Sequence, residues 1–221
     1  MNRRTFMHRT AATAVAAGSV LAGTPAVHAQ PKYAWKMVTA WPKDFPGVGT
    51  GASRLARAIE RMSDKRITVT VYCDGELVPA FDTFDAVASG TAEMGHASAL
   101  YWQAKHAATP FFATVPFGLN AQEMAAWLYY GGGQALWDEL YAPFNLKPFA
   151  AGSTGAQMGG WFNKEISTVK ELEGLKMRMP GLGGDVLAKL GAHVINLPGG
   201  EIQQALKAGS IDAAEWVGPL Q

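Results

Sequence analysis

The feature that most constrains the fold is the alternation of short apolar strands with helical stretches along the chain. Residues 35–41, 67–73 and 92–97 read as strands, and the stretches 49–64 and 81–89 between them read as helices. A β-α-β-α-β order implies a largely parallel sheet with right-handed crossovers. We therefore expect an α/β fold.

A second alternating unit follows a different middle region. Residues 101–120 are rich in Pro and Phe and predict an ordered surface loop, and residues 122–130 and 134–141 predict two helices. The later segments predict strands at 147–151, 157–163, 176–179, 193–197 and 213–217, and helices at 168–172, 184–190 and 200–208. Glycines at both ends of segment 152–155 make it the best hinge candidate, because glycine absorbs large backbone rotations. We expect two lobes, residues 30–151 and 152–221.

The first 29 residues predict a cleaved export signal. Arg3, Arg4 and Arg9 precede an Ala-rich apolar run, and residues 27–29 provide the small side chains that a signal peptidase requires. The run is too short to span a bilayer, which needs about 20 residues. The Arg3-Arg4 pair resembles a twin-arginine signal, although an ordinary secretory leader could also hold two adjacent arginines. We expect a periplasmic protein.

The composition of the mature chain excludes several kinds of partner and site. Removal of residues 1–29 takes away three of the 19 basic residues and none of the 18 acidic ones, so the net charge becomes −2. With no basic stripe, neither nucleic acid nor an anionic membrane is an expected partner. A single cysteine, Cys73, permits no internal disulfide, and its place in an apolar strand predicts a buried, inert thiol. The sequence stops directly after a predicted strand, and we expect it to be incomplete at the C-terminus.

Motifs for enzyme chemistry are missing. The sequence has no G-x-S-x-G, no H-E-x-x-H and no P-loop lysine motif. His96, His106 and His193 are dispersed, so no metal or redox ligand set is apparent. We expect no enzyme activity. An exported, cofactor-bearing oxidoreductase remains the alternative, because twin-arginine export often serves such proteins.

Two strand ends carry the best candidates for ligand binding. Arg178 follows a short apolar strand and precedes Pro180 and a helix, and Glu215 and Trp216 close another strand. Open α/β sheets bind ligands at such ends, and a guanidinium can hold a carboxylate through two parallel hydrogen bonds. Alternatively, Arg178 is a buried arginine paired with an acid across the lobe interface. The carboxylate of Glu215 needs a cation or an arginine as partner.

Three further residues are ambiguous on composition alone. Gln157 is either a ligand contact or a satisfied glutamine on an edge strand. Trp216 is either core or a pocket wall, and the same two interpretations apply to Tyr101, which follows a predicted strand.

Together these segments resemble the solute-binding proteins of tripartite ATP-independent periplasmic (TRAP) transporters, closest to the branch that binds 2-oxo acids and related monocarboxylates. The resemblance runs from about Trp35 to Gln221. It is most specific in residues 172–178 and 206–216 and in the strand that starts at Trp35. It implies a two-lobed α/β venus-flytrap fold that closes over an organic anion and delivers it to a membrane permease. A sensor domain with the same fold would have the same sequence signals.

The resemblance also implies roles for individual residues. Arg178 would hold the ligand carboxylate, with Tyr101, Gln157 and Trp216 as further ligand contacts. A sodium or calcium ion would bind with the ligand, held by Gln157, Glu215 and the main-chain carbonyl of Trp216, an oxygen set that suits a hard cation. The expected ligand is a 2-oxo acid such as pyruvate or a 2-hydroxy acid such as lactate. A homodimer is implied for the full-length protein.

Overall fold

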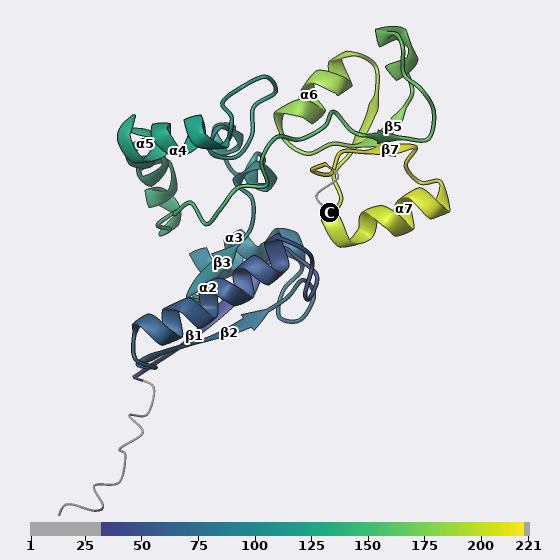
Figure 1. The fold of residues 1–221 in the computed structure, drawn as a ribbon. Helices are drawn as coiled ribbons and strands as arrows, with labels where there is room; N and C mark the ends of the chain where they lie inside the picture. Colours follow the sequence, from purple (N-terminus) through teal and green to yellow (C-terminus); the bar gives the residue numbers. More distant parts are fainter. Residues whose placement is uncertain (1–31, 219–221) are drawn as a thin grey trace, which may run out of the picture.

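Two separate sheets organise the protein (Figure 1). The computed structural model describes residues 32–218, so the predicted export signal lies outside the described residues. The first sheet has the strand order β2-β1-β3, and the second has the order β4-β7-β5-β6. Figure 1 places the first sheet at one end of the molecule and the second sheet at the other. The division into lobes at residue 152 stays a prediction.

The first sheet is parallel and is covered by a helix on each face. Its elements are β1 (Tyr33–Thr39), α2 (Val48–Met62), β2 (Ile67–Tyr72), α3 (Thr83–Ala88) and β3 (Met94–His96). Successive side chains of a strand point to opposite faces. Met37 accordingly packs with Ala52 and Ala56 of α2, whereas its neighbour Val38 packs with Ala86 of α3. One buried strand thus fixes both helices.

The middle region forms two helices, as predicted, beside an aromatic cluster in which Phe112 stacks on Trp127 and Trp137. They are α4 (Ala121–Tyr130) and α5 (Gly133–Tyr141). Asn120 starts α4 because its side chain accepts hydrogen bonds from the main-chain N–H groups of Gln122 and Glu123. Gly132, with φ of 84°, separates the helices in a backbone conformation that favours glycine.

The described residues also contain six 3₁₀ turns, at Ala80–Asp82, Ala99–Trp102, Thr109–Phe112, Ala142–Phe144, Val169–Leu172 and Gly199–Glu201.

The second sheet carries α6 on one side and α7 on the other (Figure 1). Its elements are β4 (Trp161–Phe162), β5 (Lys176–Arg178), α6 (Leu182–Lys189), β6 (His193–Ile195), α7 (Ile202–Ala208) and β7 (Ala213–Ala214). β5 pairs in parallel with β6 and β7, and β4 pairs antiparallel with β7. Ala213 packs in the cluster that includes Leu187 of α6, whereas Ala214 packs with Ile202 and Ala205 of α7. Small side chains on β7 therefore let both helices approach the sheet.

The predicted strand at 147–151 is wrong. That segment has no regular structure, because Pro148 has no N–H to donate to a ladder. The carbonyl of Pro148 instead accepts a hydrogen bond from Gln134 Nε2 at 2.9 Å. A side chain of α5 thus satisfies the backbone where a neighbouring strand was expected.

Other predicted strands are shorter than expected. The strand predicted at 157–163 is reduced to Trp161–Phe162. Before it, Gly160 lies against Met177, and a Cβ at this glycine would come within 2.6 Å of the Met177 methyl group. Cys73 follows β2 rather than lying inside it, and its side chain is partly exposed, so the prediction of a buried thiol is also wrong.

The described residues contain no helix that combines the length and the apolar character needed to cross a membrane.

Met37 provides a test of the first core. It is fully buried, whereas Met62 at the end of α2 is 80% exposed. We expect Met37→Ala to lower the free energy of unfolding by about 2–5 kcal/mol, because it removes packed atoms and leaves a cavity. Met62→Ala, the matched control, should change it by less than about 0.5 kcal/mol. Urea denaturation measures both, and equal effects would contradict the assignment of Met37 to the core.

Candidate functional site

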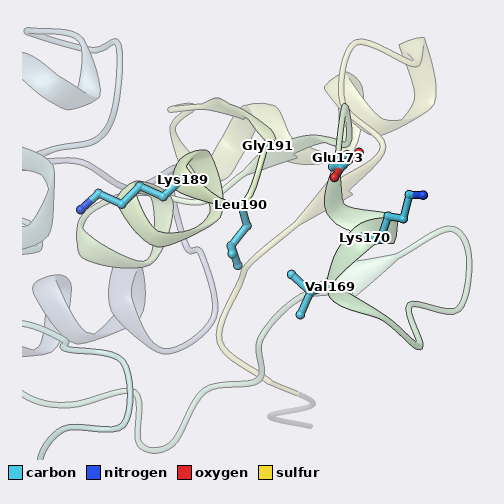
Figure 2. A pocket seen from close by; sticks show the side chains of 6 residues that line it. All are labelled: Val169, Lys170, Glu173, Lys189, Leu190 and Gly191. Carbon is cyan, nitrogen blue, oxygen red and sulfur yellow. The ribbon is translucent and has the colours of Figure 1, made fainter.

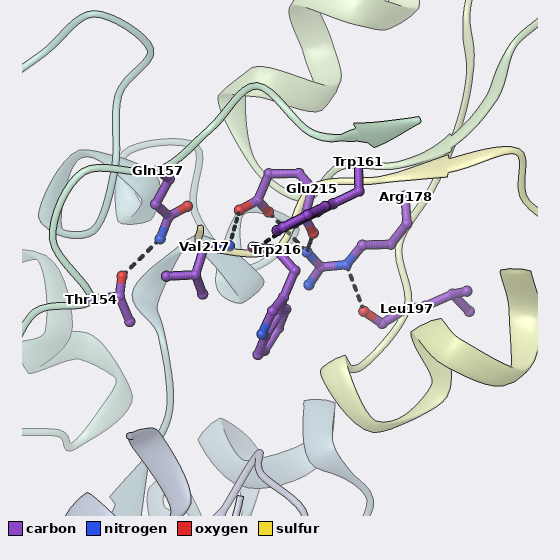
Figure 3. A network of polar contacts seen from close by, with 8 residues as sticks. All are labelled: Thr154, Gln157, Trp161, Arg178, Leu197, Glu215, Trp216 and Val217. Atoms are coloured by element: carbon purple, nitrogen blue, oxygen red, sulfur yellow. Dashed lines mark hydrogen bonds and ion pairs between the residues drawn. The ribbon is translucent and has the colours of Figure 1, made fainter. Parts of the chain in front are cut away.

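Arg178 is a buried arginine at the end of β5. Its side chain is 1% exposed. Nη1 donates to the Glu215 carboxylate (Oε2, 2.9 Å) and to the Glu215 main-chain oxygen (2.7 Å), and Nε donates to the Leu197 oxygen at 3.1 Å (Figure 3). Nη2 is buried and has no hydrogen-bond partner in residues 32–218. One edge of the guanidinium is therefore held in place while a donor remains unused.

Glu215 lies directly beyond β7 and pairs with Arg178. Because β5 and β7 are parallel neighbours, Arg178 and Ala214 stand opposite each other, so the next residue reaches the guanidinium. The other carboxylate oxygen, Oε1, accepts from the Val217 N–H at 3.1 Å. Burial raises the pKa of the Glu215 carboxyl, and the positive charge of Arg178 opposes this rise without cancelling it.

Two aromatic rings stand against the arginine. The guanidinium carbon of Arg178 lies 5.3 Å from the centre of the Trp216 ring, within cation–π range. The same ring packs on Phe45, near the first sheet, at 5.5 Å, and it occupies the space where a Cβ of Gly199 would lie, only 2.4 Å away. Burial raises the pKa of Tyr101, and the nearby Arg178 charge opposes that rise. Both ends of the molecule thus contribute to the surroundings of Arg178.

Gln157 lies beside this group but is not on a strand. The Met158 N–H donates to the Val217 oxygen at 2.9 Å, which holds the Gln157 loop against the segment that follows Glu215. Gln157 is exposed, and its Nε2 donates to Thr154 Oγ1 at 2.8 Å. In the view of Figure 3, Glu215 lies between Gln157 and Arg178.

The structure therefore brings Arg178, Glu215, Trp216 and Tyr101 together, with Gln157 at the margin. Arg178 pairs with Glu215, which directly follows a strand of the same sheet, and not with an acid across the lobe interface. Among the described residues, the Glu215 side chain pairs with the side chain of Arg178. An arginine is one of the two expected kinds of partner, and a cation is the other. The ligand and metal roles of these residues stay predictions.

Sequence reasoning missed several contacts of the site. The Trp216 carbonyl accepts a hydrogen bond from Trp161 Nε1 at 3.0 Å, and the Leu197 carbonyl accepts from Arg178. A main-chain acceptor leaves no mark in a sequence, because every residue has one. The backbone conformation of Val217, with φ of 43°, could not be predicted either, since β-branched residues rarely adopt it.

A separate surface hollow of about 570 Å³ lies near the end of α6 (Figure 2). Its lining residues are Val169, Lys170, Glu173, Lys189, Leu190 and Gly191. None of the predicted site residues lines it, and both lysines are exposed.

Residues 32–218 contain no group of three or more His, Cys, Asp or Glu side chains placed to hold a metal. The predicted metal ligands would not form such a group, because only Glu215 supplies a carboxylate. The other two ligands are the Gln157 amide and the main-chain oxygen of Trp216.

Comparison with known proteins identifies the family. Residues 37–221 match the model of the bacterial extracellular solute-binding proteins, family 7, also named DctP. The chain belongs to this family. The predicted family is confirmed, and these are receptors that bind solutes outside the cytoplasm.

Similar proteins agree with this assignment. A monocarboxylate 2-oxoacid-binding periplasmic protein of Nostoc sp. is 53% identical over 201 residues, which cover 91% of this chain and 53% of that protein. A TRAP periplasmic solute-binding protein of Pseudoalteromonas atlantica, solved with bound sodium and pyruvate, is 47% identical with a TM-score of 0.82. The corresponding Colwellia psychrerythraea protein, with bound calcium and pyruvate, is 46% identical with a TM-score of 0.82. Both alignments cover 85% of this chain and 57% of the solved chain.

These matches confirm the predicted α/β fold of a periplasmic binding protein. They do not favour the alternative of an exported oxidoreductase. The chain spans about half the length of the relatives it matches.

The raised pKa of Glu215 predicts a pH dependence of stability. Below pH 4.5, the ordinary pKa, the carboxyl is protonated in both folded and unfolded states. Between 4.5 and the raised value, the folded state keeps a proton that the unfolded state releases. The contribution of Glu215 to the free energy of unfolding therefore falls as pH rises through this window and then levels off.

We expect Glu215→Gln to remove this contribution. Urea denaturation between pH 4 and 7 should give a difference, wild type minus variant, that declines with pH. Glu139→Gln, an exposed change on α5, is the control and should leave the profile unaltered. A difference that rises with pH would show that Arg178 outweighs burial at this carboxyl.

Proposed function

We propose that this protein is the periplasmic receptor of a TRAP transporter, and that it captures a small 2-oxo or 2-hydroxy monocarboxylate together with a metal ion. The observation that carries the proposal is the buried Nη2 of Arg178, which lacks a partner among residues 32–218. Leaving a buried donor unsatisfied costs about 1–3 kcal/mol, and more for a charged group. A ligand carboxylate would satisfy it and add a charge-assisted hydrogen bond.

The surroundings of Arg178 suit a small anion. The guanidinium is already oriented by its bonds to Glu215 and Leu197, so little side-chain entropy remains to be lost on binding. The aromatic rings of Trp216 and Tyr101 provide apolar walls near the charge. This arrangement combines a charged anchor with apolar walls, as small-ligand sites commonly do.

The oxygen atoms beside Arg178 fit a hard cation. Each Glu215 oxygen accepts one hydrogen bond, and the Trp216 carbonyl accepts one, so both groups retain lone pairs. The Gln157 amide uses its nitrogen toward Thr154, which leaves its oxygen free. We propose that Gln157, Glu215 and the Trp216 carbonyl hold the ion. One of the two pyruvate-bound relatives contains sodium and the other calcium. The cation would screen the ligand from the Glu215 carboxylate, which alone would repel it.

Binding would proceed by lobe closure without covalent chemistry. Contacts between the two ends of the molecule support a closed arrangement, including Phe45 on Trp216 and a 2.6 Å hydrogen bond from Gln103 Nε2 to Asp185. Segment 152–155 would supply the hinge. A ligand that binds both lobes favours the closed state by its difference in affinity for the two states.

The remaining predicted features belong to the same proposal. We infer export through the twin-arginine pathway from Arg3 and Arg4. The partner would be the membrane permease of the transporter, and the full-length receptor would form a homodimer. Its role would be capture and delivery, so no turnover of the ligand is expected.

Arg178 provides the direct test of ligand binding. Isothermal titration of the full-length protein with pyruvate, lactate and longer 2-oxo acids should give saturable binding. We expect Arg178→Ala to weaken binding about 100-fold or more, because truncating one member of a buried charge pair costs about 2–5 kcal/mol. Arg57→Ala, an exposed change on α2, is the matched control and should bind as wild type does. Undiminished affinity in Arg178→Ala would remove the anchor from the proposal.

Glu215 provides the test of the metal ion. Pyruvate should bind at least tenfold more tightly when sodium or calcium is present than in chelator-treated, sodium-free buffer. Glu215→Gln should abolish most of this enhancement, because an amide offers the cation no charge. Glu201→Gln, an exposed acid before α7, should retain it. Equal pyruvate affinity with and without the ions would contradict the metal site while leaving the Arg178 anchor intact.

A further inference from the structure

A hydrogen bond at the edge of the first sheet links a histidine to the wall of the site. Trp41 Nε1 donates to His96 Nδ1 over 2.8 Å. His96 ends β3, and Trp41 lies two residues beyond the end of β1. Thr39 and His96 are opposite each other in the parallel register, and the Ala40 N–H donates to the His96 oxygen. Both residues therefore lie at the carboxyl ends of parallel strands, where open α/β sheets bind ligands.

This bond determines which ring nitrogen of His96 carries the proton when the ring is neutral. An indole N–H can only donate, so His96 Nδ1 must accept, and a neutral ring then carries its proton on Nε2. Burial lowers the pKa of His96, in agreement with a neutral ring. Trp41 in turn obtains the hydrogen-bond acceptor that a buried indole N–H requires, since its side chain is 5% exposed.

A continuous series of contacts leads from this pair to Arg178. The Trp41 ring lies 6.1 Å from the Tyr101 ring, centre to centre, and 6.2 Å from the His96 ring. The Trp216 ring packs in the same cluster as Tyr101, and its centre lies 5.3 Å from the guanidinium carbon of Arg178. Trp41 and Tyr101 also belong to the apolar cluster that receives Trp216 from the second sheet. The rotation of one indole therefore affects two sides of the site.

We propose that His96 is a positioning residue that sets the size limit of the ligand pocket. By accepting the Trp41 N–H it fixes the indole, and the indole fixes the Tyr101 ring in the cluster that also holds Trp216 beside Arg178. This inference rests on the proposed function, because the pocket concerned is the one that holds the carboxylate. Without the acceptor, the buried Trp41 N–H would have to turn toward another partner, and the wall would shift with it.

Two substitutions separate the acceptor from the bulk of the side chain. His96→Asn keeps an oxygen close to the place of Nδ1, whereas His96→Leu removes the acceptor and retains an apolar side chain of similar reach. His106→Leu is the matched control, because the Nδ1 of this exposed histidine accepts only from the Ala108 N–H in a loop. Isothermal titration with pyruvate and with 4-methyl-2-oxopentanoate measures affinity and size selectivity.

We expect His96→Leu to weaken pyruvate binding at least tenfold and to reduce the preference for pyruvate over the longer acid. His96→Asn should recover most of both, within about threefold of wild type, and His106→Leu should match wild type. Equal affinity and selectivity in all four proteins would overturn the proposal. Equal losses in the Asn and Leu variants would also overturn it, because the acceptor would then not be the cause.

A measurement without ligand keeps this test independent of the proposed function. The ¹⁹F signal of fluorotyrosine-labelled Tyr101, assigned with Tyr101→Phe, should keep its position in His96→Asn and move in His96→Leu. If the Leu variant does not fold, Trp41→Phe removes the donor instead and should also move the signal. If wild type binds no 2-oxo acid, the proposed function fails, and the ¹⁹F comparison alone decides whether His96 positions Tyr101. An unmoved signal in the folded variants would overturn that role.

Discussion

The ion pair between Arg178 and Glu215 is the interaction on which the rest of the site depends. Both groups are largely removed from water, with side chains 1% and 13% exposed. Burying a single charge is costly, and each of these residues makes the burial of the other tolerable. The pair also spans the parallel strands β5 and β7, so its geometry follows directly from the register of the second sheet.

The pair does not use all the hydrogen-bonding capacity of its members. Arg178 retains Nη2, and the Glu215 carboxyl keeps a raised pKa because Arg178 compensates only part of its desolvation. One end of the pair therefore favours an additional anion and the other an additional cation. Under the proposed function, this complementarity would let a monocarboxylate and a metal ion occupy neighbouring positions, which a simple surface ion pair would not.

Much of this arrangement could be predicted from the sequence, for identifiable reasons. The spacing of the apolar residues predicted α2, β1 and β2. Arg178 could be identified because it is a charged residue between an apolar strand and Pro180. The failures at 147–151 and 157–163 have local causes, namely a proline without an N–H and a glycine, Gly160, whose φ of 155° is not that of a strand residue. The Leu197 carbonyl and the hydrogen bond from Trp161 to the Trp216 carbonyl could not be foreseen, since both depend on which loops meet in space. The pairing of Trp41 with His96 was hidden in the same way, because the two lie 55 residues apart.

The contact between Trp216 and Gly199 has a mechanical consequence. The indole occupies the volume that any larger residue at position 199 would need, and Gly199 begins the turn that leads into α7. Displacement of α7 toward the sheet would therefore push directly on the ring that stands over Arg178. The position of this helix and the geometry around Arg178 are thus joined by one rigid aromatic side chain.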